Sequence, residues 1–137
     1  MAATYTEIAS VTTTAAAPFI KFGNIPQTYT DLILVYDFVS SANGDYALIF
    51  NDDAGANYNR GYGFANVTAG TDSNGNNSAV PGYLNAYFIG TVSSGTTNIM
   101  EYTNTNMYKT AVTSANINGS NNYVGLYVGT WNSTAAI

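Results

Sequence analysis

The chain has 137 residues, the size of one domain, and 46% of them are apolar, which is enough for a hydrophobic core. Only 8% are charged and the net charge is −5, so nucleic-acid binding and docking on anionic membranes are not expected. The lack of histidine and cysteine removes the commonest general base, thiolate nucleophiles and thiolate metal ligands. Composition therefore predicts a single folded domain over residues 1–137, not an enzyme, with no cofactor.

Strand signals recur along the whole chain. Threonine and tyrosine favour strands, asparagine and glycine favour turns, and the apolar period is close to two, which is typical of an all-β sandwich or barrel. Nine strands are expected, at residues 4–12, 18–22, 31–40, 46–50, 60–67, 83–91, 97–103, 109–117 and 123–131. The segments 51–59 and 68–81 are predicted to be loops.

The segment 31–40 carries the strongest strand pattern. One face holds Leu32, Leu34, Tyr36 and Phe38, and the other holds Ile33, Val35 and Val39. Apolar residues on both faces predict that both are covered, in a central strand or at a subunit contact. The pair Asn43-Gly44 predicts a hairpin that brings residues 46–50 back against this strand.

The last expected strand, 123–131, also has two apolar faces. Val124, Leu126 and Val128 face one way, and Tyr123, Tyr127 and Trp131 the other. A strand in a small sandwich has one core-facing side, so the surplus face needs a cover. We therefore expect a homo-oligomer, as a trimer. The interface candidates are Tyr36, Phe38, Tyr123, Tyr127 and Trp131.

Catalytic signatures are lacking. Glycoside cleavage needs two carboxylates at a set spacing, and the most unusual acidic positions are Asp37 and Glu101, both expected within strands. No S-x-x-K pattern pairs a serine with Lys21 or Lys109, so both lysines are expected at the surface. The polar side of each strand accounts equally for the two acidic residues, and no catalytic residue is assigned.

The segment 51–58 offers oxygen ligands beside a glycine. Asp52, Asp53 and Asn57 are weak candidates for a hard cation such as Ca²⁺. Their spacing does not match an EF-hand loop, and no glutamate closes the segment. Since Asp and Asn also stabilise turns through side-chain hydrogen bonds, a plain turn is the favoured interpretation and no metal is expected.

Exposed tyrosines can form sugar-binding platforms. The candidates are Tyr58, Tyr62, Tyr83, Tyr108 and Tyr123. The favoured alternative is that each places an apolar ring at the edge of a core or at a subunit contact, with its hydroxyl in water.

Three sequence segments resemble segments found in a known protein family. They are Asn24-Ile25-Pro26-Gln27-Thr28-Tyr29-Thr30-Asp31-Leu32, the run at residues 49–58, and the run at residues 128–137. They are similar to segments in small virion surface proteins of tailed bacteriophages, many of them marine or cyanobacterial. Members of this family occur as capsid decoration proteins and as tail-fibre domains. The resemblance implies a jelly-roll-like antiparallel β-sandwich and no catalytic residues. The family form usually has glycine at position 52 and continues beyond Ile137.

From this resemblance we expect a structural protein on the virion surface. A capsid decoration (cement) protein, bound to the major capsid protein, fits a domain that starts almost at Met1. The alternative is a tail-fibre adhesion module that recognises host glycans. Residues 1–12 are expected to act as an arm that is exchanged or docked, and strand 123–131 as an open edge covered by a neighbouring chain.

Overall fold

The computed structural model describes residues 5–40, 44–66, 72–80, 84–88, 92–118 and 123–137. These residues form eight strands: β1 (Leu32–Val39), β2 (Gly44–Leu48), β3 (Tyr58–Asn66), β4 (Asp72–Val80), β5 (Leu84–Phe88), β6 (Val92–Met100), β7 (Lys109–Asn118) and β8 (Tyr123–Trp131). No helix occurs in the described ranges, and therefore none that could cross a membrane.

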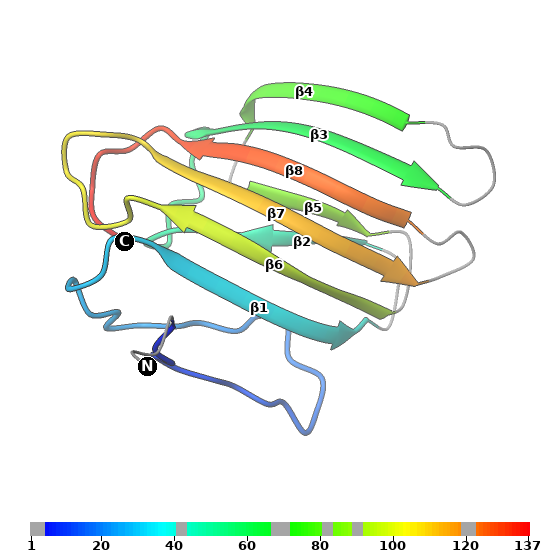
Figure 1. Ribbon diagram of the computed structural model, residues 1–137, viewed down its shortest axis with the longest axis horizontal. Helices are drawn as coiled ribbons and strands as arrows, with labels where there is room; N and C mark the ends of the chain where they lie inside the picture. Colours follow the sequence, from blue (N-terminus) through cyan, green and yellow to red (C-terminus); the bar gives the residue numbers. More distant parts are fainter. Residues whose placement is uncertain (1–4, 41–43, 67–71, 81–83, 89–91, 119–122) are drawn as a thin grey trace.

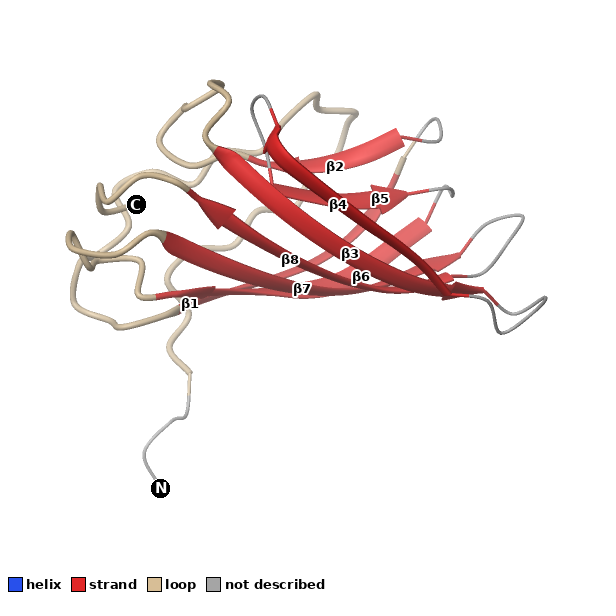
Figure 2. Ribbon diagram, turned by 90° about the horizontal axis from the view of Figure 1, so that it is seen from above, coloured by secondary structure: helices blue, strands red, loops and turns tan. Residues whose placement is uncertain are grey.

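The strands form two antiparallel sheets. The larger has the order β1-β6-β7-β8-β3-β4, and the smaller pairs β2 with β5 (Figure 1). β5 contacts β3, β7 and β8, and Figure 2 shows the small sheet against one face of the large one. The predicted all-β antiparallel class is confirmed. Because the strands divide six and two, the jelly-roll arrangement stays a prediction.

The large sheet has one covered and one open face. We call the face toward β2 and β5 the inner face and the opposite one the outer face. The core cluster consists of Phe50, Tyr58, Ile99, Tyr102, Ala111 and Trp131, with Ile25, Leu32, Leu48 and Ile137 packed against it. The alternation of β1 and β8, in which every second residue is more exposed, follows from this one-sided cover.

Small residues on the inner face make room for aromatic rings. A Cβ at Gly125 would lie 2.6 Å from the ring of Tyr127, and one at Gly95 would lie 2.6 Å from the hydroxyl oxygen of Tyr36. Between these rings, the buried hydroxyls of Thr97 and Thr113 share a hydrogen bond of 2.7 Å. Glycine is therefore required at the two positions by close approach.

Three sequence predictions about strands are wrong. Residues 4–12 and 18–22 form no strand from residue 5 onward, and all residues of the described part of this segment are exposed. The predicted loop 68–81 contains β4, which pairs with β3. Its sequence, Asp-Ser-Asn-Gly-Asn-Asn-Ser-Ala-Val, has little intrinsic strand preference, so pairing decides its structure.

The pairing of two strands also differs from the prediction. β2 pairs with β5, and β1 pairs with β6, so residues 46–50 do not return against β1 as predicted; Asn43 itself lies outside the described part. β1 is an edge strand and not a central one. β8 lies between β7 and β3, so the open edge predicted there is wrong.

Candidate functional site

The outer face of the large sheet is apolar and open to solvent. On β8 it carries Val124, Leu126 and Val128, which are 66%, 53% and 44% exposed, and on β1 it carries Ile33, Val35 and Val39, which are all exposed. Large apolar side chains gathered on one face are typical of a protein interaction surface. The outer face is therefore our candidate functional site.

Mostly small polar residues lie between these two apolar stripes, with Val112 of β7 in line between Ile33 and Val128. The register places Thr96 of β6 and Ser114 of β7 in line between Val35 and Leu126, and their hydroxyls are 3.0 Å apart. On the far side of β8, Gly61 pairs with Val128 and leaves the surface flat. On the part of this face formed by β1, β6, β7 and β8, Asp37 alone is charged. Such a face can be buried with little cost from charge desolvation.

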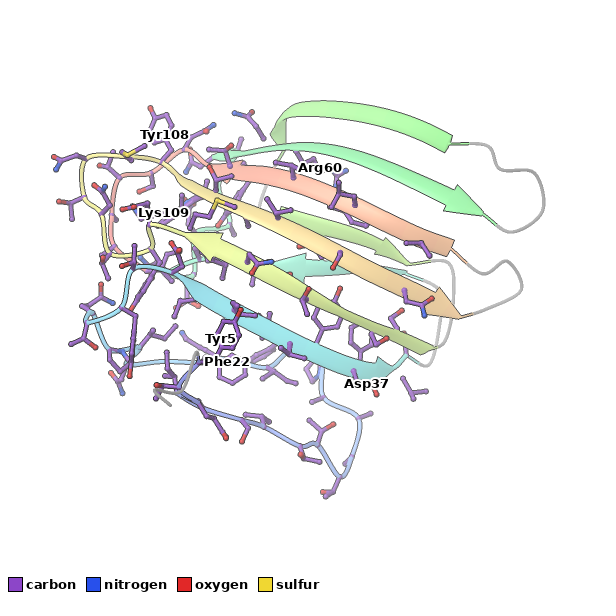
Figure 3. All side chains as sticks on the ribbon, in the orientation of Figure 1. Tyr5, Phe22, Asp37, Arg60, Tyr108 and Lys109 are labelled. Carbon is purple, nitrogen blue, oxygen red and sulfur yellow. The ribbon has the colours of Figure 1, made fainter. Side chains whose placement is uncertain are left out.

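An exposed segment precedes β1. We call residues 5–24 the N-terminal arm. All of them are exposed, including the large side chains of Tyr5, Ile8, Val11, Phe19, Ile20 and Phe22. Figure 2 shows the arm leaving the two sheets on the side opposite β2 and β5, and Figure 3 shows Tyr5 and Phe22 on the β1 side of the molecule. The arm is longer than the predicted 1–12, whose first four residues lie outside the described part.

The root of the arm, in contrast, is fixed. Ile25 packs against the core cluster, and the hydroxyl of Tyr102 donates a hydrogen bond to the Pro26 carbonyl oxygen. The Gln27 amide donates to the backbone oxygen of Ile137 at 2.7 Å. An arm that is exposed along its length therefore starts from a defined point of the fold.

The exposed area of the chain is large for its mass. The surface is 8518 Å² for 14.5 kDa, whereas a compact monomer of this mass exposes about 6,900 Å². The single chain therefore exposes roughly 1,600 Å² more than a compact monomer of its mass would.

The predicted interface aromatics lie on the other face. Tyr127 and Trp131 are 5% and 2% exposed and belong to the interior. Tyr36 and Phe38 are half-buried on the inner side of β1, with ring centroids 5.6 Å apart. The side chain of Tyr123 lies outside the described part. A sequence signal for this choice of face exists in β8, where glycines alternate with Tyr127 and Trp131 and make room for their rings.

The segment 50–58 is a hydrogen-bonded turn. The Asp53 carboxylate accepts hydrogen bonds from the Gly55 N–H at 2.9 Å, from the Asn57 amide at 2.9 and 3.1 Å, and from the Trp131 indole at 2.7 Å. In order of importance, Trp131, Asn57 and Gly55 hold the pKa of Asp53 below its ordinary value. Since N–H donors occupy both carboxylate oxygens, the geometry favours the turn interpretation over a cation site.

Asp52 is directed away from Asp53. It forms an exposed ion pair of 2.5 Å with Lys21 of the arm. Asp52 and Asn51 both have positive φ, of 57° and 51°, and the Asp53 N–H donates to the Phe50 carbonyl at 2.9 Å. This is the geometry of a type I′ turn, in which glycine is preferred. The described residues contain no group of three acidic side chains that could hold a metal.

Tyr58 connects this turn to the core. Its ring is fully buried and stacks on Trp131, with centroids 6.5 Å apart. Its hydroxyl accepts the Phe50 N–H at 3.1 Å and donates to the Asp53 carbonyl at 3.0 Å. Burial raises the pKa of Tyr58, Asp53 adds to the rise, and the Phe50 hydrogen bond opposes it.

Lys109 is buried, contrary to the predicted surface position. Its ammonium group donates to the carbonyls of Asn104, of Met107 at 2.9 Å and of Thr134 at 3.4 Å. Burial lowers the pKa of Lys109, and the charge of Glu101 opposes this shift. The lysine thus joins the 104–107 loop to the segment after β8. No spacing in the sequence indicates this role, because its acceptors are backbone oxygens.

The catalytic and sugar-binding candidates are not brought together. Asp37 pairs with Ser94 and Glu101 follows Met100, so the backbone positions of the two acidic residues lie about seven strand residues, roughly 23 Å, apart along β6. Glycosidase pairs need about 5–9.5 Å. Of the tyrosines, Tyr58 is buried and Tyr108 is exposed at a loop (Figure 3). The side chains of Tyr62, Tyr83 and Tyr123 lie outside the described part.

The chain matches no protein-family model, no curated protein and no solved structure. The resemblance to phage virion proteins therefore rests on the three sequence segments named above.

Proposed function

We propose that the protein is a structural component of a tailed-phage virion, a capsid decoration protein that forms a trimer and binds the major capsid protein. The observation that carries the assembly role is the apolar outer face, which is exposed in the single chain. The proposed virion location rests on the three sequence segments that resemble phage surface proteins. Under this proposal the two sheets form a β-sandwich of jelly-roll type.

Interface chemistry supports a structural role over an enzymatic one. The outer face offers aliphatic side chains and hydroxyls, which suit packing against another protein surface. Asp53 and Lys109, the acidic and basic residues with shifted pKa values, are occupied in holding turns together. We therefore assign no catalytic residue.

The copy number in purified virions tests this function. The chain is measured by mass spectrometry against an isotope-labelled standard of itself, with the major capsid protein measured in the same sample. Decoration predicts hundreds of copies in a fixed ratio to the capsid protein. A few tens of copies or fewer would assign the chain to the tail and favour the glycan-binding alternative. Absence from the particle would overturn the virion role altogether.

A further inference from the structure

We propose that the N-terminal arm of one copy lies on the outer face of a neighbouring copy, so that the chain assembles by exchanging arms. The inference concerns copies of this chain alone. It therefore stands or falls independently of the virion location.

The arm and the outer face both expose large apolar side chains. The arm exposes Phe19 at 74% and Tyr5 at 72%, and the outer face exposes Val35 and Val124 to similar extents. Arm and face belong to one chain, yet neither covers the other there. Burying two such surfaces against each other is favourable in proportion to the apolar area removed from water.

Both the arm and the outer face carry few charges. The arm has only two charged residues, and both are engaged: Glu7 accepts a hydrogen bond from Ser10 at 2.7 Å, and Lys21 pairs with Asp52. Across β1, β6, β7 and β8 the outer face has only Asp37, near one end of β1 (Figure 3). Contact between arm and face therefore brings few charges into the interface, and the Glu7 carboxylate keeps a hydrogen-bond donor in Ser10.

The arm is long enough to lie along the outer face of a neighbouring copy. Beyond Lys21, which pairs with Asp52, residues 5–20 of the arm span about 53 Å if extended, well beyond the roughly 26 Å length of β1. A subunit that gives its arm to one neighbour and receives an arm from another forms two contacts of this kind.

Cross-linking in trans tests the exchange directly, because the chain has no cysteine of its own. One chain carries Ile8→Cys in the arm and a second chain, of different tag length, carries Leu126→Cys on the outer face. The two are co-expressed and treated with a short bismaleimide. A cross-linked product containing one chain of each kind is expected. Replacing Leu126→Cys by Asn106→Cys, at an exposed loop position, is the matched control and should give little product.

Two outcomes would overturn the exchange. The first is equal yield from Leu126→Cys and Asn106→Cys, or no mixed product at all. The second is a link that forms only within single chains carrying both Ile8→Cys and Leu126→Cys, since the arm would then cover its own chain.

A mass measurement on folded variants complements the cross-link. Val124→Thr, Leu126→Thr and Val128→Thr are combined in one chain, because threonine keeps the strand preference. Each apolar anchor lost should weaken assembly about tenfold or more, so the triple variant should be monomeric with an unchanged β-type circular dichroism spectrum. Deletion of residues 2–22 should do the same, while Asn106→Ala, at an exposed loop position outside the arm and the outer face, should keep the wild-type mass. A folded triple variant or deletion with wild-type mass would overturn the exchange.

Discussion

Trp131, the last residue of β8, donates its indole N–H to the carboxylate of Asp53 at 2.7 Å, across 78 positions of sequence. The same carboxylate holds the turn between β2 and β3 through Gly55 and Asn57. One side-chain pair therefore joins the end of the large sheet to the turn that enters it.

Removing either partner should lower stability. Asp53→Ala and Trp131→Phe should each shift the urea unfolding midpoint downward, because the first leaves the donors of this cluster without an acceptor and the second removes the indole N–H that joins β8 to the turn. The double variant should lose less than the sum of the two, since both changes break the same bond. Glu7→Ala, in the exposed arm, is the control and should leave the midpoint unchanged. Additive losses would show that the bond contributes nothing.

Acid should weaken this cluster. Because the folded pKa of Asp53 lies below its ordinary value of 3.8, the carboxylate stabilises the fold above that pH. This contribution is lost as the pH falls through the lower, folded pKa. Urea midpoints of wild type and Asp53→Asn, measured from pH 7 to pH 2, should differ most near neutrality and converge below the ordinary pKa. A constant difference would contradict the assigned hydrogen bonds.

Glycine at position 52 should stabilise the turn. Asp52 has a φ of 57°, which costs an L-residue energy that glycine does not pay. Its ion pair with Lys21 is exposed and contributes little. Asp52→Gly should therefore raise the free energy of unfolding by about 0.5–1 kcal/mol. Lys21→Ala, which removes the same ion pair without changing φ, should have almost no effect. Destabilisation by both variants would mean that the ion pair outweighs the backbone strain.

Gly95→Ala should be strongly destabilising. The added Cβ would contact the backbone oxygen of Ser114 and lie 2.6 Å from the hydroxyl of Tyr36. Overpacking of this kind costs about 1–3 kcal/mol, measurable by urea unfolding. Gly23→Ala is the matched control, because a Cβ there would meet nothing within 4 Å. Equal effects at the two glycines would refute the close packing of Tyr36 on β6.

The local sequence pattern predicted the strands in which two kinds of residue alternate along the chain. β1, β7 and β8 lie within one or two residues of the segments expected from the sequence. β4 was missed because its residues are polar and small, and its structure depends on pairing with β3. The start of β6 was missed because Ser93, Ser94 and Gly95 are typical of turns, although Ser93 is buried in the sheet.

The two-faced strands posed a different problem. Alternation alone shows that β8 has an aliphatic and an aromatic face, but not which of them is covered. The choice depends on residues distant in sequence, such as Asp53, which receives the Trp131 indole. The turn at Asp53 was predicted from composition, whereas its role as the acceptor for β8 and the burial of Lys109 required the three-dimensional structure.

The mass of the purified protein in solution tests the central claim, assembly through the outer face and the arm, most directly. Sedimentation equilibrium over a range of concentrations should give three times the chain mass of 14.5 kDa, falling toward the single-chain mass on dilution. A mass of one chain at every concentration, for a protein that is fully folded by circular dichroism, would contradict the claim.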